Sequence, residues 1–145
     1  MKNIRKQEKG FTIIEVLIVL AIAGLIMLIV FLAVPALQRN SRNNARNNDA
    51  SRISSAVTEC LANRNGQTNS CDDDDEVDPG TLSELTTVNY DTASVPGDDV
   101  HDTANVAFGR VCNEDGSGAT TDGASARSHV VLFRIEENIP RCIGS

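Results

Sequence analysis

The stretch KGFTIIEVLIVLAIAGLIMLIVFLAVPAL, residues 9–37, decides the fold of this 145-residue chain. From Val16 to Leu37 it contains no charged side chain. At about 1.5 Å per residue, a helix over this run would cross the roughly 30 Å hydrocarbon core of a bilayer. Glu15 stands at the head of the run, where an acid near lipid costs free energy. The sequence therefore predicts a transmembrane helix over residues 11–37 and a charge that needs an explanation.

A local explanation for Glu15 is a helix cap. Thr12-Ile13-Ile14-Glu15 has the T-x-x-E spacing of a capping box, and the helix dipole favours an acid at this end. The cap does not account for the Gly10-Phe11 step before it, or for residues 1–10, where four basic side chains face one acid. A secretory signal peptide would have a shorter apolar region and a clearer cleavage site. A plain single-pass anchor also stays open at this point.

These residues resemble the class III signal of type IV pilins. A short basic leader ends at Lys9-Gly10, and Phe11, the TIIE segment and an unbroken apolar run follow. The resemblance covers about residues 5–37. It implies that a membrane-bound prepilin peptidase removes the leader, residues 1–10, by cutting between Gly10 and Phe11. The same enzyme would then methylate the new amine of Phe11.

The resemblance also gives the charge a role. It implies that Glu15 is needed for filament assembly, where it can meet the Phe11 amine of a neighbouring subunit. An unpaired buried amine and an unpaired buried carboxylate are both costly, so the pair would fix the register between subunits. Pro35 lacks a backbone donor, so we expect it to kink or locally open the helix.

The stem after the apolar run, residues 38–65, reads as an amphipathic continuation of the same helix. Apolar positions recur at helical spacing from Ile53 to Leu61, and Gly66 is a credible stop. The prediction is one helix from about Phe11 to Arg64. A row of stem arginines has three interpretations: a solvated helix face, a contact with acidic heads of neighbouring subunits, or, less favoured because no aromatic stacking platform accompanies it, DNA binding. The row is Arg39, Arg42 and Arg46.

The remainder, residues 66–145, predicts a small exported β head. Turn signals such as Pro79-Gly80 and Asp115-Gly116 separate strand candidates at about 84–90, 105–112 and 128–136. So few strands favour an antiparallel sheet laid on the stem helix. The predicted fold class is therefore α+β, a long N-terminal helix packed on a small C-terminal sheet, as the resemblance to pilins also implies.

Four cysteines, all beyond the apolar run, predict two disulfides in an exported head. Three pairings are open, and chain order favours Cys60–Cys71 and Cys112–Cys142 because each closes a local loop. A zinc site is disfavoured because the chain has no CxxC spacing. The acidic segment 71–80 has Val77 where a calcium loop needs glycine, so we expect a solvated loop and no metal.

No catalytic constellation stands out, and no cofactor is expected; the chain reads as a peptidase substrate rather than an enzyme. The resemblance to pilins implies a structural subunit that forms a helical homo-oligomeric filament. The resemblance implies a prepilin peptidase, an assembly ATPase and a membrane platform protein as partners. The precursor would lie in the inner or cytoplasmic membrane and the assembled pilus outside the cell.

Two other functions stay open. One is a pseudopilin of a type II secretion or DNA-uptake machine, and the other is a membrane-anchored exported binding domain in which Glu15 only caps its helix. From Phe11 onward nine arginines face 19 acids, which disfavours nucleic-acid binding by the head. The basic stem could still attract nucleic acid, so this partner stays open. The sequence does not choose between motility, adhesion and DNA uptake.

Overall fold

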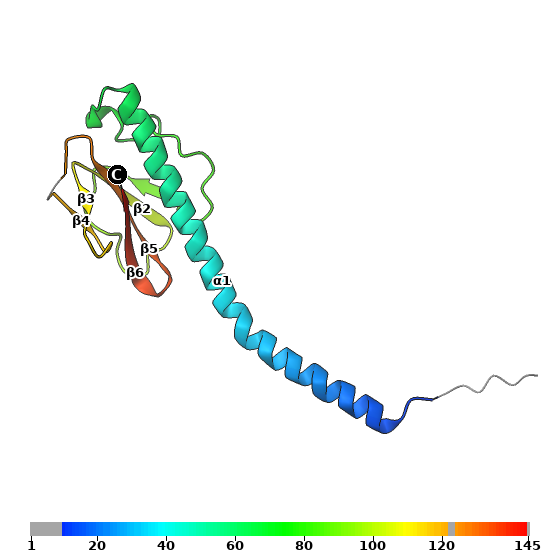
Figure 1. Cartoon of the computed structure of the whole chain (residues 1–145). Helices are drawn as coiled ribbons and strands as arrows, with labels where there is room; N and C mark the ends of the chain where they lie inside the picture. The colour runs from blue at the N-terminus through cyan, green and yellow to red at the C-terminus, as the bar shows by residue number, and fades with distance from the viewer. Residues whose placement is uncertain (1–9, 122–123, 145) are drawn as a thin grey trace, which may run out of the picture. The chain divides into compact units, whose positions relative to one another are not determined.

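The computed structural model describes residues 10–121 and 124–144 (Figure 1). Of the predicted leader, all but Gly10 lies outside the described residues. Contacts between Cα atoms divide the chain into two compact units, Met1–Gln38 and Arg39–Ser145. The elements are α1 Ile13–Asn63, η1 Thr68–Ser70, β1 Thr87–Asn89, β2 Thr103–Phe108, β3 Val111–Cys112, β4 Ala119–Thr120, β5 His129–Ile135, η2 Glu136–Asn138 and β6 Ile139–Gly144.

Helix α1 ends where the sequence predicts. The backbone N–H of Gly66 donates to the Leu61 carbonyl at 2.7 Å, and the N–H of Arg64 donates to Cys60 at 2.9 Å. Asn65 and Gly66 both have positive φ, 56° and 83°, which turns the chain out of the helix. The predicted span of about 11–64 is confirmed to within two residues at each end.

The main sheet has the strand order β1-β2-β5-β6. Strand β5 lies between β2 and β6 and is antiparallel to both. Val131 of β5 is opposite Val106 of β2, and Leu132 of β5 is opposite Cys142 of β6. The prediction of an antiparallel sheet is wrong for one pair, because β1 runs parallel to β2. Parallel neighbours need a crossover connection. Residues 90–102 supply it where the sequence alone suggested only turns.

Strand β6 and a second sheet were not predicted, and the strand predicted at about 105–112 is divided into β2, which ends at Phe108, and β3, which begins at Val111. Strand β6 contains Pro140, which argues against a strand; it is tolerated because β6 is at the edge of the sheet and needs no outward donor there. The β3–β4 pair forms a second, two-stranded sheet. Each of its strands is two residues long, too short to show an alternating pattern.

The head core lies where the second half of α1 crosses the main sheet (Figure 1). Ile53 and Val57 of the helix are fully buried with Val131 and Phe133 of β5. The other face of β5 is buried too, in a smaller cluster that includes Leu132 and Cys142. Strand β5 is therefore the centre of the head, which explains why its sequence is almost continuously apolar.

We predict that Ile53→Ala lowers the free energy of unfolding of the head by about 2–5 kcal/mol, because Ile53 is fully buried and the truncation leaves a cavity. Urea unfolding of the precursor in detergent micelles, followed by helical circular dichroism, measures the change. Ser55→Ala on the exposed side of the same helix is the control. Equal midpoints for the two variants would contradict this packing.

Candidate functional site

The predicted cleavage site lies just outside the helix. Gly10, Phe11 and Thr12 are exposed and precede α1, which begins at Ile13. The Phe11 side chain is 89% exposed, and nothing lies within 4 Å of the position that a Cβ on Gly10 would occupy. Among the described residues nothing covers the Gly10–Phe11 peptide bond, as cleavage by a peptidase would require.

Glu15 caps the start of α1, as the T-x-x-E spacing predicts. Its Oε2 accepts from the backbone N–H of Thr12 at 2.9 Å and from the Thr12 hydroxyl at 2.7 Å. In return the Thr12 Oγ1 accepts from the backbone N–H of Glu15 at 3.4 Å. The capping box is confirmed, and it fixes the acid against the first turn of α1.

From Val16 to Leu37 the helix is apolar on every side. It is long and apolar enough to cross a membrane by length and composition, and none of its most apolar 18-residue window is buried in this structure. The segment stays helical through Pro35. Pro35 still removes one helical hydrogen bond. The predicted kink at this residue stays a prediction.

A sequence model described as the prokaryotic N-terminal methylation motif matches residues 5–31. The chain carries the class III signal of type IV pilins and pseudopilins. The match covers Gly10, Phe11 and Glu15, whose geometry is described above; residues 5–9 lie outside the described part. Together with an apolar N-terminal helix, this signal fits a membrane-anchored precursor. Comparison with curated proteins and with solved structures gives no match.

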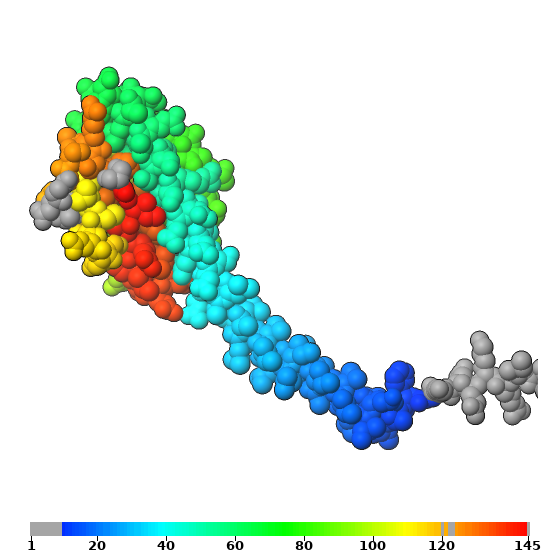
Figure 2. Space-filling model, in the orientation of Figure 1, coloured from blue at the N-terminus to red at the C-terminus, as the bar shows by residue number. Residues whose placement is uncertain are grey.

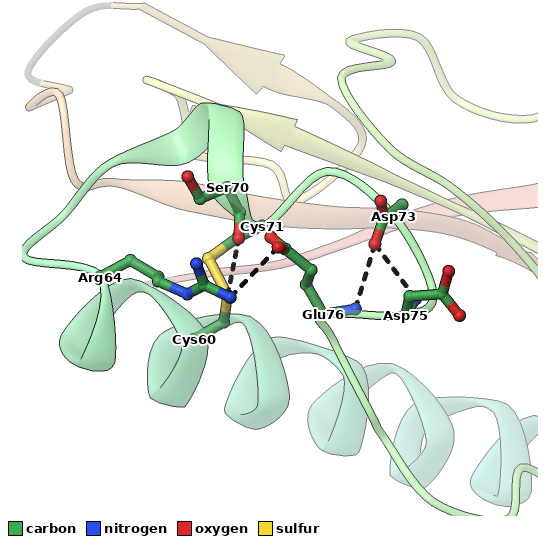
Figure 3. Close-up of a disulfide and its surroundings, with 7 residues drawn as sticks. All are labelled: Cys60, Arg64, Ser70, Cys71, Asp73, Asp75 and Glu76. Atoms are coloured by element: carbon green, nitrogen blue, oxygen red, sulfur yellow. Dashed lines mark hydrogen bonds and ion pairs between the residues drawn. A yellow bond between two sulfur atoms is a disulfide. The ribbon is translucent and has the colours of Figure 1, made fainter.

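Two disulfides hold the head, in the pairing that chain order favours. One joins Cys60 of α1 to Cys71, 11 residues on, and ties the helix end to the loop after it (Figure 3). The other joins Cys112 of β3 to Cys142 of β6, across 30 residues, and so ties the small sheet to the main one. Closing loops of these lengths is worth roughly 2–4 kcal/mol each.

The acidic segment after Cys71 folds on itself. The Asp73 carboxylate accepts from the backbone N–H groups of Asp75 and Glu76 at 3.1 and 3.0 Å, and Glu76 pairs with Arg64 of α1 at 3.1 Å (Figure 3). Within residues 10–121 and 124–144, no group of three or more His, Cys, Asp or Glu side chains is placed to hold a metal ion. The carboxylates instead cap a turn and pair with the helix.

The row of stem arginines contacts the head of its own subunit. Arg42 Nε lies 2.8 Å from Glu136 Oε1, and Arg39 Nη1 lies 3.1 Å from Glu137 Oε1. Arg46 is almost fully buried and lies 3.4 Å from the same Glu136 oxygen. The pairing lowers the pKa of Glu136, chiefly through its hydrogen bond with Arg42. Arg39 and Arg42 stay exposed, as a solvated face predicts, but the row also pairs within its own subunit, which the sequence did not suggest; a contact with neighbouring subunits stays a prediction.

Asp49 organises a loop that sequence reasoning missed. It is 2% exposed on the buried face of α1, and its Oδ2 accepts from the backbone N–H groups of Ser83, Glu84 and Leu85 at 2.7–3.1 Å. The one available signal was its position, four residues before Ile53 on the face that is apolar farther along. A charge on that face needs buried partners.

His129 is another buried titratable group, and it lies between α1 and β5. It begins β5, is 1% exposed, and its Nε2 lies 3.0 Å from the hydroxyl and 3.1 Å from the carbonyl oxygen of Ser54 on α1. Burial lowers the pKa of His129 below its usual value, and its contact with the Ser54 backbone opposes part of this shift. Burial therefore favours the neutral imidazole, which links the start of β5 to α1.

Asp49→Ala should lower the free energy of unfolding by about 3 kcal/mol, since it leaves three backbone donors unpaired, one of them buried. Asp49→Asn keeps an acceptor oxygen and should cost less. Thermal unfolding of the precursor in micelles measures both, with the exposed Asp75→Ala as control. If Asp49→Ala melts at the temperature of the control, this carboxylate does not hold the loop.

The head should lose stability on mild acidification because of His129. Its folded pKa is lowered, so this contribution is fully present above the unfolded value near 6.5 and is lost as the pH falls below it. Urea midpoints at pH 7.5 and 5.5 should therefore differ in the wild type and differ less in His129→Gln. A variant that keeps the full pH dependence would exclude this histidine as its source.

Proposed function

We propose that the chain is the structural subunit of a type IV pilus filament and polymerises through its N-terminal helix. The observation that carries this proposal is the methylation motif at the start of a helix that is apolar on every side and uncovered in its own unit. Such a surface needs lipid before assembly and neighbouring subunits after it. A helix that only anchored a domain would not need a cleavable leader before it.

Processing creates the second half of an ion pair. Removal of residues 1–10 leaves a positive amine on Phe11, four residues before the Glu15 carboxylate. Within a packed bundle of apolar helices both charges need a partner, and a wrong register leaves both without one. In the filament we therefore place Glu15 of one subunit against the Phe11 amine of the next. The prepilin peptidase cuts the bond between Gly10 and Phe11 and then methylates the new amine of Phe11.

The chain is divided accordingly. Residues 1–10 form a cytoplasmic leader, 11–37 the transmembrane and assembly helix, 38–65 the amphipathic stem and 66–145 the exported head. An assembly ATPase and a platform protein extract subunits from the inner or cytoplasmic membrane into a surface filament. Two disulfides favour a head exposed outside the cell, and so a surface pilus over a pseudopilin. The subunit acts as a structural component and carries out no reaction itself.

The decisive experiment compares Glu15→Val and Glu15→Gln with wild type in cells that assemble the filament. We expect both variants to insert in the membrane and to be cut after Gly10. They should enter sheared surface fibres at about a tenth of the wild-type level or less, and each tenfold drop corresponds to about 1.4 kcal/mol of lost assembly free energy. Mass spectrometry of membranes and fibres measures cleavage, methylation of Phe11 and incorporation.

Glu15→Gln separates the two roles of the carboxylate, because an amide oxygen can still accept from Thr12 but carries no charge. If Glu15→Gln assembles normally while Glu15→Val does not, the cap alone matters and the ion pair is rejected. Glu59→Gln, on the exposed side of the stem, is the control. A protein that keeps Met1 and never enters fibres supports the membrane-anchored alternative, and fibres in which it is only a trace component support the pseudopilin.

A further inference from the structure

Polar contacts join the first two turns of the stem to the head, and no apolar side chain of these turns is buried. On α1 the buried apolar side chains begin at Ala50 and continue through Ile53 and Val57 to Leu61. Before them, residues 39–46 bury only the side chain of Arg46. The stem thus has two attachments in sequence, a polar one over residues 39–46 and an apolar one over residues 50–61.

The polar attachment converges on the turn between β5 and β6. Glu136 Oε1 meets both Arg42 Nε and Arg46 Nη1, and the Glu136 backbone N–H donates to the Asn43 side-chain oxygen at 2.9 Å. Two outer pairs complete it, Arg39 with Glu137 at 3.1 Å and Arg46 with Glu84 at 3.6 Å. We refer to this set as the clasp: Arg39, Arg42, Asn43 and Arg46 on the stem, and Glu84, Glu136 and Glu137 on the head.

The turn on the head side of the clasp has hydrogen bonds of its own within the head. In the turn, Asn138 exchanges hydrogen bonds with Asp99, accepting from its backbone N–H at 3.0 Å and donating to its carboxylate at 3.2 Å. Arg134 donates to the Asn138 carbonyl oxygen at 2.6 Å and pairs with Asp98 at 2.9 Å. These bonds do not involve the stem, so they can stay formed when the clasp opens.

The stem side is poorly built to stay helical by itself. Residues 39–48 read RNSRNNARNN, with five asparagines and a serine among ten residues. Asparagine and serine are weak helix formers because their side chains compete for backbone hydrogen bonds. The outermost pair is also weak, since Arg39 and Glu137 are 48% and 68% exposed and such pairs are screened by salt. Helical order here depends on the clasp.

We propose that residues 39–46 form a yielding segment, released from the head and unwound when the clasp opens while the apolar attachment at 50–61 holds. Eight residues span about 12 Å as helix and up to about 26 Å when extended. In the filament, a use that rests on the proposed function, tension carried along α1 reaches this segment before the apolar attachment. Each subunit could then lengthen without losing the fold of its head.

Hydrogen exchange of the full-length precursor in detergent micelles tests the clasp directly. Glu136→Gln removes the charge shared by Arg42 and Arg46 but keeps the backbone bond to Asn43. We expect exchange of the amides of residues 40–47 to rise about fivefold or more, as expected for the loss of a contact of this class, and exchange of residues 53–61 to stay within about twofold. Glu114→Gln, an exposed acid in the turn between β3 and β4, is the control.

Two further arms cover a variant that fails to fold. Raising the salt concentration of the wild type to about 1 M, where the Debye length is roughly 3 Å, should increase exchange in the same residues only. Glu137→Gln removes only the exposed outer pair and should give a smaller rise. The proposal is overturned if residues 40–47 are unaffected in all three arms, or if exchange rises equally over 39–61.

These measurements use the unassembled precursor, so they do not depend on whether the protein forms a pilus. A clasp that opens as described in a protein never found in surface fibres would reject the proposed function and keep the yielding segment. Normal fibres, together with residues 40–47 that exchange no faster in Glu136→Gln, would reject the yielding segment and keep the proposed function. Fibres of Glu136→Gln that lengthen no more than those of the wild type under the same load would reject the mechanical use.

Discussion

A single continuous helix has to satisfy two environments, and this constraint orders the rest of the structure. By length and composition, residues 16–37 could cross a bilayer, where no water is available to the backbone; there this stretch would form its hydrogen bonds within the helix, and it presents apolar side chains on every side. From Ala50 onward the same helix needs only one apolar stripe, because one face meets the sheet (Figure 2). The change of pattern, and not a break in the backbone, separates the two units.

Strong periodic signals in the sequence predicted the parts of the fold that depend on local patterning. The span of α1, the stop at Gly66 and strand β5, inside the predicted 128–136, all follow from spacing and turn chemistry. The parallel pairing of β1, the edge strand with Pro140 and the two-residue strands could not be predicted, since they depend on contacts with distant segments. The capping box at Thr12 and Glu15 is local, and the sequence predicted it.

The charges of the stem illustrate the same limit. Arginines at helical spacing could be read as a solvated face or as a contact with neighbours, and only the tertiary structure places Glu136 beside them. Their pairing within the head also bears on nucleic acid. A phosphate backbone would have to compete with carboxylates already paired with Arg39, Arg42 and Arg46 in a chain of net charge −7. The attraction expected of a free basic stem is therefore weakened.

The two roles considered for Glu15 are compatible because a carboxylate has more than one acceptor site. Its Oε2 takes both bonds from Thr12, and within the described residues no bond to Oε1 is found. Cutting the Gly10–Phe11 bond leaves the Thr12 donors intact, so the cap survives processing. In the filament that we propose, the cap would hold the side chain in one orientation before assembly, and this would lower the entropy lost when a neighbouring amine binds to it. A helix cap and an intermolecular ion pair can thus be consecutive uses of one side chain.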